Sequence, residues 1–241
     1  MTLLQLKDVS RRFGGVVAVN NIGLSIEKNE IVGLMGANGA GKTTLFSLIA
    51  GNLPPSAGEI LFDDRRIDGL RADQISRLGV ARTFQIVRPF SGLTVLENVT
   101  ISALFGSSRT KSMVSATNIA SEVLEEVELT NRAGDYASAL TLSGRKRLEI
   151  ARALATNPKL LMLDEVMAGL TATEGAEAVA MIRRFQETRN LTVIVVEHVM
   201  GILMDLCPRI VVLHHGALIA EGSPQDVAND SRVIDSYLGT R

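Results

Sequence analysis

The chain has 241 residues, 46% of them hydrophobic, which is enough apolar material to bury the core of one large globular unit. Its 25 Lys and Arg residues nearly balance its 26 Asp and Glu residues, so no broad basic surface for nucleic acid or anionic lipid is expected. No apolar stretch approaches the roughly 20 residues that span a bilayer, and the N-terminus lacks a basic start followed by an apolar run. We therefore expect a cytoplasmic protein that cannot cross a membrane alone. Cys207, the single cysteine, is interpreted as a small buried hydrophobic residue.

Short apolar runs that end in turn or polar residues and lead into helical patterns are typical of buried parallel strands in an α/β sheet. Before the first of these runs, alternating apolar and polar residues indicate a small antiparallel β flap. A helical pattern without a convincing strand fills residues 91–157 and indicates an inserted helical segment. The elements predicted in chain order are flap strands at 3–9 and 22–26, core strands at 31–35 and 79–84, helices at 121–128 and 145–156, core strands at 160–163 and 191–196, a hairpin of 210–214 with 217–221 around Gly216, and a last helix at 225–229.

A glycine-rich segment at 36–44, GANGAGKTT, fits the phosphate-loop pattern G-x-x-x-x-G-K-[ST] between a strand and a helix. Its glycines permit a tight turn whose N–H groups point inward at a helix N-terminus, where anions are favoured. Lys42 is expected to reach the β- and γ-phosphates of a nucleotide, and Thr43 to place its hydroxyl on Mg²⁺. The alternative is a turn that binds nothing, but the Lys-Thr pair and the flanking elements favour a phosphate site. The predicted contacts are Gly36, Asn38, Gly39, Ala40, Gly41, Lys42, Thr43 and Thr44.

Two adjacent carboxylates end the apolar strand KLLMLDE, at the strand end where ligands of open α/β sheets bind. Asp164 suits Mg²⁺, directly or through water. Glu165 suits the general base that orients and deprotonates the water attacking the γ-phosphate. Acid pairs at strand ends are often only solvated turn residues, but the phosphate loop in the same chain favours the catalytic interpretation.

Two other polar residues follow predicted core strands. His198 ends the run TVIVVEH and is placed to hold the γ-phosphate and the attacking water by hydrogen bonds. Gln85 ends ARTFQ in the same way. Taken alone, a histidine at a strand end is more often a structural residue, and Gln85 is similarly ambiguous by itself. His214 and His215 precede the hairpin glycine and are interpreted as structural.

Taken in order, GANGAGKTT, the glutamine of ARTFQ, a signature-like segment before RLEIARAL, LMLDE and the histidine of VVEH resemble the motifs of the ABC ATPases across essentially the whole chain. The resemblance implies an α/β fold, a P-loop NTPase core with a mainly parallel sheet and an antiparallel β subdomain in 1–90 and 158–241, and a helical subdomain in 91–157. It implies that Gln85 senses the γ-phosphate, contributes to the Mg²⁺ site and couples to a membrane partner, and that His198 is the switch histidine. Phe13 looks like the aromatic that stacks on adenine, with a core aromatic of the β flap as the alternative.

Longer segments, including RLEIARALATNPKLLMLDE and ALIAEGSPQDVANDSRVIDSYLG, look like ATP-binding subunits of branched-chain amino acid importers. This resemblance implies ATP and Mg²⁺ as cofactors, a second ABC ATPase subunit, identical or different, and integral membrane permease subunits on the inner face of the cell membrane. An extracytoplasmic solute-binding protein is implied indirectly, and nucleic acid is not. Related importers carry urea, amides or other small organic solutes. The alternatives are an export ATPase, as in lipopolysaccharide transport, and a soluble ABC protein of translation or DNA repair. Proteins of the latter kind usually carry tandem cassettes or a coiled-coil insertion, and neither occurs here.

The family signature LSGGQ is replaced by LTLSG at 140–144. In the ungapped register, which we prefer, Thr141 replaces serine, Leu142 and Ser143 replace the two glycines, and Gly144 replaces glutamine. The other register starts the motif at Leu142. In the family this motif presents a helix N-terminus to the γ-phosphate held by the opposite subunit, so side chains at 142 and 143 are expected to loosen that fit. The predicted nucleotide contacts are Thr141, Ser143 and Gly144.

Three cations follow the signature segment, and two further departures follow the acidic pair. The cations at 145–147 either compensate for the missing glycines beside a triphosphate or form a solvated basic helix face. Val166 stands where the family usually has proline, and Thr171 where it usually has an acidic or amide residue. We therefore expect this subunit's own half of an ATP site to be competent and its contribution to the partner's site to be altered.

Overall fold

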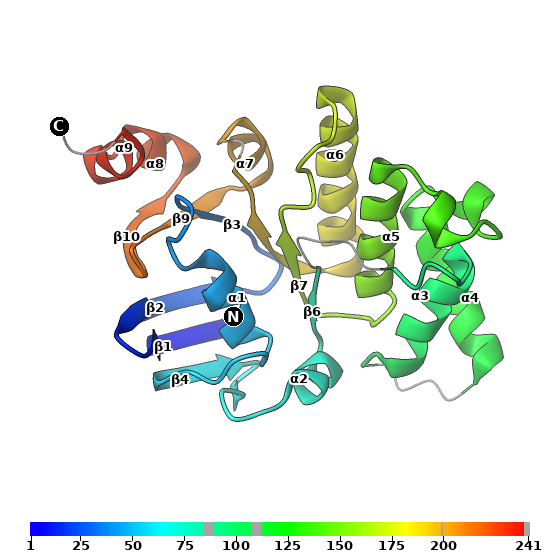
Figure 1. Cartoon of the computed structure of the whole chain (residues 1–241), viewed down its shortest axis with the longest axis horizontal. Helices are drawn as coiled ribbons and strands as arrows, with labels where there is room; N and C mark the ends of the chain where they lie inside the picture. Colours follow the sequence, from blue (N-terminus) through cyan, green and yellow to red (C-terminus); the bar gives the residue numbers. More distant parts are fainter. Residues whose placement is uncertain (84–88, 108–111, 199, 239–241) are drawn as a thin grey trace. The chain divides into compact units, whose positions relative to one another are not determined.

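The computed structural model describes residues 1–83, 89–107, 112–198 and 200–238 (Figure 1). The chain divides into two compact units, the first made of Met1–Ile75 with Thr192–Arg241 and the second of Ser76–Leu191. Helix α2 (Ala72–Leu78) spans the boundary between them. Within the described ranges, no helix is both long enough and apolar enough to cross a membrane.

The first unit contains an antiparallel sheet with the strand order β2-β1-β4-β5. The polypeptide turns from β1 to β2 at Gly14, which has φ +57°, so that Phe13 pairs with Val16. Apolar residues such as Leu4, Leu6 and Val9 are buried on one side of β1, which explains the alternating pattern of the predicted β flap. The strands of this sheet are β1 (Thr2–Phe13), β2 (Val16–Glu27), β4 (Ala57–Phe62) and β5 (Arg65–Arg66).

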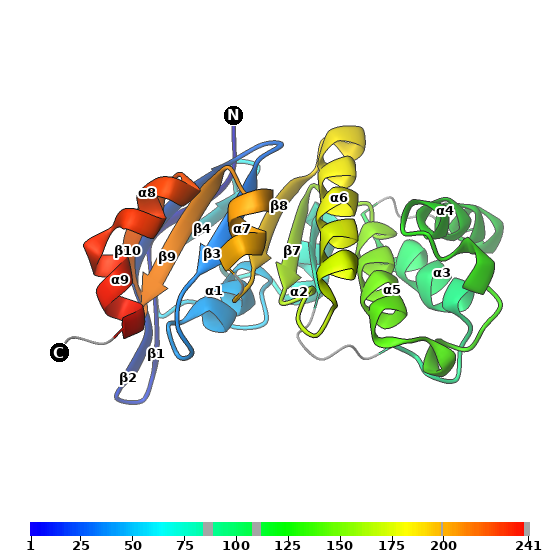
Figure 2. The same ribbon diagram turned by 90° about the horizontal axis from the view of Figure 1, so that it is seen from above.

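A mainly parallel set of strands forms the other half of this unit. β3 pairs in parallel with β8 and β9, and β10 pairs antiparallel with β9. Every residue of β3 and β8 is buried, so both read as continuous apolar runs. Helices α8 and α9 lie together against β10 (Figure 2). The elements are β3 (Ile31–Met35), α1 (Lys42–Ile49), β8 (Thr192–Val196), α7 (Met200–Leu206), β9 (Arg209–His214), β10 (Ala217–Gly222), α8 (Pro224–Asn229) and α9 (Ser231–Leu238).

The second unit combines two parallel strands, β6 and β7, with a group of helices. Helices α3, α4 and α5 pack on one another (Figures 1 and 2). Helix α3 begins with a capping box in which Thr94 and Glu97 satisfy each other's backbone N–H groups. The elements are β6 (Val80–Arg82), α3 (Val95–Phe105), α4 (Met113–Glu126), the short 3₁₀ helices Thr130–Arg132 and Ala137–Ala139, α5 (Leu142–Leu154), β7 (Leu160–Asp164) and α6 (Ala172–Arg189).

The four predicted core strands are confirmed as β3, β6, β7 and β8, and the predicted hairpin as β9 and β10. The last residue of the second predicted strand, Phe84, lies outside the described residues. Cys207 is buried, as predicted. The prediction that the helix at 225–229 is the last one was wrong, because α9 follows it. Asp230 ends α8, and its side chain accepts the N–H of Arg232 to start the next helix.

Candidate active site

The phosphate-loop residues join β3 to α1 in the first unit. Helix α1 starts after Gly41, no side chain caps it, and its first turn carries no acidic residue. The N–H groups of this turn therefore have no acceptor in the helix, and an anion fits there. A Cβ on Gly36 (φ +152°) would lie 2.4 Å from the carbonyl oxygen of Leu213, and one on Gly41 (φ +104°) 2.5 Å from that of Ala18. Only glycine fits at either position.

Lys42 is buried at the first position of α1, with 6% of its surface exposed. Its Nζ donates to the carbonyl oxygens of Gly36, at 2.6 Å, and Ala37, at 3.1 Å. The loop thus bends over the ammonium group. Thr43, the next residue, is exposed on the first turn of the helix, so its hydroxyl is accessible to a ligand.

Two residues that the sequence analysis did not assign to the site also contact the loop. The N–H of Gly216, in the turn between β9 and β10, donates to the carbonyl oxygen of Ala40 at 3.0 Å. From α9, the oxygen of Tyr237 is hydrogen-bonded by the backbone of Gly36, while partial burial raises the pKa of the phenol. The hairpin turn and the C-terminal helix therefore both support the phosphate loop. Gly216 was predicted only as the glycine of the hairpin turn. A turn glycine that also contacts the phosphate loop has the same sequence pattern as one that does not.

Phe13 lies at the end of β1 and is 44% exposed, so the alternative interpretation as a core aromatic was wrong. The guanidinium of Arg11 lies 4.7 Å from the centre of its ring, a cation–π distance. The Arg11 side chain also donates from Nη1 to the carbonyl oxygen of Pro54 at 2.8 Å. Arg11 therefore orients an exposed ring that is suited to stacking on a planar base.

The two other residues predicted to contact the γ-phosphate are His198 and Gln85. His198 lies two residues beyond the end of β8 and is exposed, whereas the intervening Glu197 is buried. Gln85 lies outside the described residues.

In the second unit, Asp164 is the last residue of β7 and is 3% exposed. Its Oδ2 accepts a hydrogen bond from Nη2 of Arg82 at 2.8 Å, and its N–H donates to Oγ1 of Thr83 at 3.0 Å. Arg82 is nearly as buried as its partner. Arg82 and Thr83 thus hold the acidic strand end, and the sequence analysis did not single out either residue.

No group of three or more His, Cys, Asp or Glu side chains that could hold a metal occurs in the described parts of the chain. Mg²⁺ bound with a nucleotide takes most of its ligands from phosphates and water and only one or two from the protein. The carboxylate of Asp164 and the exposed hydroxyl of Thr43, each taken separately, are oxygen groups of a type that suits such an ion.

The signature segment begins α5. Thr141 is the N-cap, and its Oγ1 accepts the N–H of Gly144 at 3.2 Å. Leu142 is 50% exposed. The hydroxyl of Ser143 hydrogen-bonds Glu174 on α6, and together with Thr171, which contributes most, it lowers the pKa of that carboxyl group. Ser143 is therefore already engaged by its own chain.

Thr171 is the N-cap of α6. It forms a capping box with Glu174, whose N–H donates to Oγ1 of Thr171 at 3.3 Å. Threonine in place of an acidic or amide residue therefore preserves the helix start.

The cations that follow the signature all have acceptors in this chain. Arg147 pairs with Glu128 and Glu177, and Arg145 donates to the carbonyl oxygen of Ser138 at 2.8 Å. Lys146 is 6% exposed and donates to the carbonyl oxygen of Glu165 at 2.8 Å. The interpretation as a solvated basic face was therefore wrong for Lys146, which is buried.

Residues 19–168 match the model of the ABC transporter family, and residues 217–241 match that of the branched-chain amino acid ATP-binding cassette transporter. The chain belongs to the ABC transporter family. It is 39% identical over 249 residues to the high-affinity branched-chain amino acid transport ATP-binding protein LivG of Escherichia coli, with 98% of each chain covered. It is also 32% identical to the lipopolysaccharide export system ATP-binding protein LptB of Haemophilus influenzae, covering 99% of this chain and 98% of LptB.

Solved structures of ABC cassettes have the same fold. The ADP conformation of an ATP-binding cassette of an ABC transporter superposes with a TM-score of 0.91 at 27% identity, with 100% of both chains covered. A dimeric post-hydrolysis state of another cassette, bound to ADP and Pi, gives 0.82 at 28% identity over 92% of this chain and 99% of that one. The α/β P-loop NTPase fold is thereby confirmed, and this ABC protein is an ATPase.

Proposed function

We propose that this ABC ATPase powers the uptake of branched-chain amino acids, or of a related small organic solute, through integral membrane permease subunits. The observation that carries the proposal is the identity of 39% to LivG over 98% of both chains. The match of residues 217–241 to a branched-chain amino acid cassette model adds support from a region outside the general ABC match. Export, as performed by LptB, is the second candidate because that relative also aligns over nearly the full length.

The predicted site residues outside the signature segment have the following roles in this proposal. Residues 36–44 bind the phosphates, and Phe13 stacks on the adenine of ATP. Asp164 holds Mg²⁺ together with Thr43 and Gln85, and when bound this ion supplies charge neutralisation of the phosphates. Glu165 takes the proton of the attacking water, and His198 orients that water and the γ-phosphate.

The proposed working assembly contains a second ABC ATPase and the permease subunits, which hold the chain at the cytoplasmic face of the membrane. A solute-binding protein on the other side takes part indirectly. Within the chain, we propose that residues 1–90 and 158–241 form the nucleotide-binding core and that 91–157 form the helical subdomain with the signature region.

Reconstitution tests this function. The tagged chain is purified with its membrane partners, which are identified by mass spectrometry, and the complex is placed in proteoliposomes with the solute-binding protein. ATP-dependent movement of radiolabelled leucine, isoleucine and valine toward the ATPase side is expected, with urea and short amides as comparison solutes. Movement of a lipid substrate away from the ATPase side, or permeases of an export system, would contradict the proposal.

A separate prediction concerns the signature. If the partner is a different ATPase with a normal signature, the site formed by the partner's phosphate loop and Thr141, Leu142 and Ser143 of this chain should turn over slowly. Replacing both Leu142 and Ser143 by glycine should raise its rate, by up to about 10²-fold, which is the cost of one lost backbone donor to a transition-state oxyanion. The ATPase rate of the mixed complex, with Glu165→Gln silencing the other site, measures this.

Ser143→Ala is the matched control for the glycine variant. It removes the hydrogen bond to Glu174 without allowing the backbone a closer approach, so it should leave the rate low. Equal rates with and without the two glycines would exclude the steric explanation, and a partner site that is fast from the outset would show that LTLSG is a working signature.

A further inference from the structure

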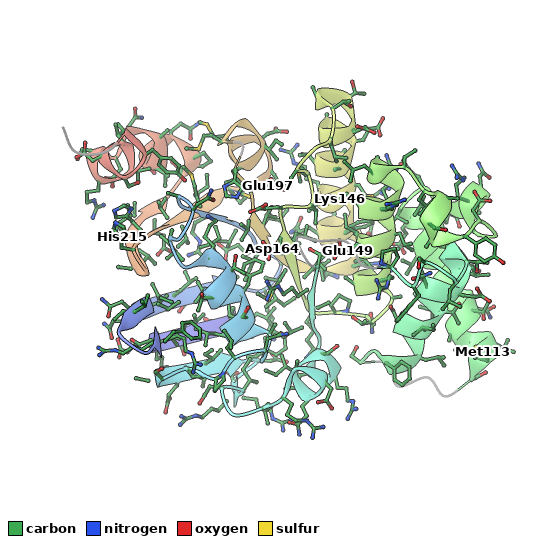
Figure 3. The ribbon with its side chains drawn as sticks, viewed as in Figure 1. Met113, Lys146, Glu149, Asp164, Glu197 and His215 are labelled. Carbon is green, nitrogen blue, oxygen red and sulfur yellow. The ribbon has the colours of Figure 1, made fainter. Side chains whose placement is uncertain are left out.

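Lys146 connects the signature helix to the strand end that carries the two acidic residues. It lies in the first half of α5, and Figure 3 labels it there, with Asp164 at the end of β7. Its Nζ donates to the backbone carbonyl oxygen of Glu165 at 2.8 Å, and 6% of the residue is exposed. This contact lies entirely within the second unit.

Burying an ammonium group is costly unless an acceptor replaces its water. Among the residues that the structure describes, Lys146 forms no ion pair, and the acceptor that it does reach is the neutral carbonyl group of Glu165. A lysine that served only to fill space could be replaced by methionine without this cost. The burial of a charge against one carbonyl therefore indicates that the carbonyl's position matters.

Glu165 has an unusual backbone. Its φ is +52°, in the left-handed region that side chains other than glycine seldom adopt. The same carbonyl oxygen accepts the N–H of Ala168 at 3.2 Å. Two donors, one of them charged, therefore hold the peptide group that follows Glu165. Because φ and ψ of Glu165 set the direction of its Cα–Cβ bond, they also set where its carboxylate points.

We propose that Lys146 is a positioning residue that keeps the backbone of Glu165 in its left-handed conformation and so directs the Glu165 carboxylate toward the attacking water. This inference rests on the proposed role of Glu165 as the base. It gives Lys146, a side chain of the signature helix, a function within its own subunit. This function is separate from the predicted contact of the helix N-terminus with the γ-phosphate that the partner subunit holds.

Lys146→Met tests the proposal, because methionine has a similar length and lacks the donor. In the assembled complex, kcat for ATP should fall by about 10- to 10²-fold, which is the cost of misplacing a catalytic group by about 1 Å. The KM for ATP and the affinity of the isolated chain for a fluorescent ATP analogue should stay within about twofold of wild type. Lys146→Arg, which keeps a charged donor, should recover part of kcat. Lys7→Met, at an exposed lysine of β1, should behave as wild type.

Hydrogen exchange supplies a readout independent of turnover. In the nucleotide-free chain, the amide of Ala168 should exchange faster in Lys146→Met than in wild type, because its acceptor is no longer held in place. If Lys146→Met does not fold, Lys146→Gln, whose amide is shorter and uncharged, is measured in the same way. Unchanged exchange at Ala168, or a kcat equal to that of wild type in a folded Met or Gln variant, would overturn the proposal.

A double-mutant cycle separates this proposal from the one on which it rests. In a Glu165→Gln background the base is already lost, so Lys146→Met should cause no further loss of the residual rate. A full additional loss would mean that Lys146 acts independently of Glu165. If Glu165→Gln itself turns over at nearly the wild-type rate, the assignment of the base fails. If Glu165→Gln is inactive while Lys146→Met keeps its kcat, only the positioning role fails.

Discussion

Glu165→Gln is expected to lower the turnover of ATP by about 10²- to 10⁴-fold and to leave ATP binding intact. Glu165 directly follows Asp164 at the end of β7, so its side chain leaves the strand end next to the proposed Mg²⁺ ligand. The amide of glutamine has the size of the carboxylate but cannot accept the proton of water. The loss should therefore appear in kcat and not in nucleotide affinity.

Steady-state ATPase measurements on the assembled transporter at saturating MgATP, together with titration of a fluorescent ATP analogue, test this expectation. Glu187→Gln is the matched control, because it makes the same change at an exposed position of α6 and should retain the wild-type rate. Turnover of Glu165→Gln close to that of wild type would remove Glu165 from the role of base.

Lys42→Ala should weaken the binding of ATP by about 10- to 10²-fold, corresponding to the loss of one or two charge-assisted hydrogen bonds to the phosphates. The Lys42 ammonium is held inside the loop by the carbonyl oxygens of Gly36 and Ala37, at the first turn of α1. Because the lysine is assigned to the β- and γ-phosphates, the loss should be larger for ATP than for AMP.

Titration of fluorescent ATP and AMP analogues against the isolated chain measures this difference. Since the substitution also removes two hydrogen bonds within the loop, thermal unfolding of the nucleotide-free variant is the control for a folding defect. An ATP affinity equal to that of wild type in a folded variant would mean that the loop does not hold the phosphates through Lys42.

Several elements that the sequence analysis missed had recognisable signals. Thr171 caps the start of helix α6, and Glu174 three residues later completes a capping box that can be read in the sequence TATE. Helix α9 starts immediately after Asp230, but a break of one residue after α8 reads as the end of a helical pattern. The ends of helices depend on such caps. Because a capping sequence is short and common, it does not by itself identify a helix.

The contacts that tie the acidic strand end to the rest of its unit were not predictable in the same way. Arg82 reaches Asp164 across 82 positions because β6 and β7 pair in parallel with Arg82 opposite Met162. Lys146 reaches Glu165 across 19 positions because α5 packs where its buried side meets the end of β7. Strand register and helix packing decide both pairs, and neither leaves a mark in the local sequence.

The sequence by itself determined the family, the positions of the core strands along the chain and the phosphate loop, because each depends on short-range patterns: apolar runs, a glycine-rich turn, and a Lys-Thr pair at a helix start. The tertiary structure decided which side chains support that chemistry. The Gly216 turn against Ala40, Arg82 on Asp164 and Lys146 on Glu165 are contacts between segments far apart in the chain. These contacts form because folding removes the buried donors and acceptors from water. Each donor or acceptor must then pair with a group that the fold brings within reach.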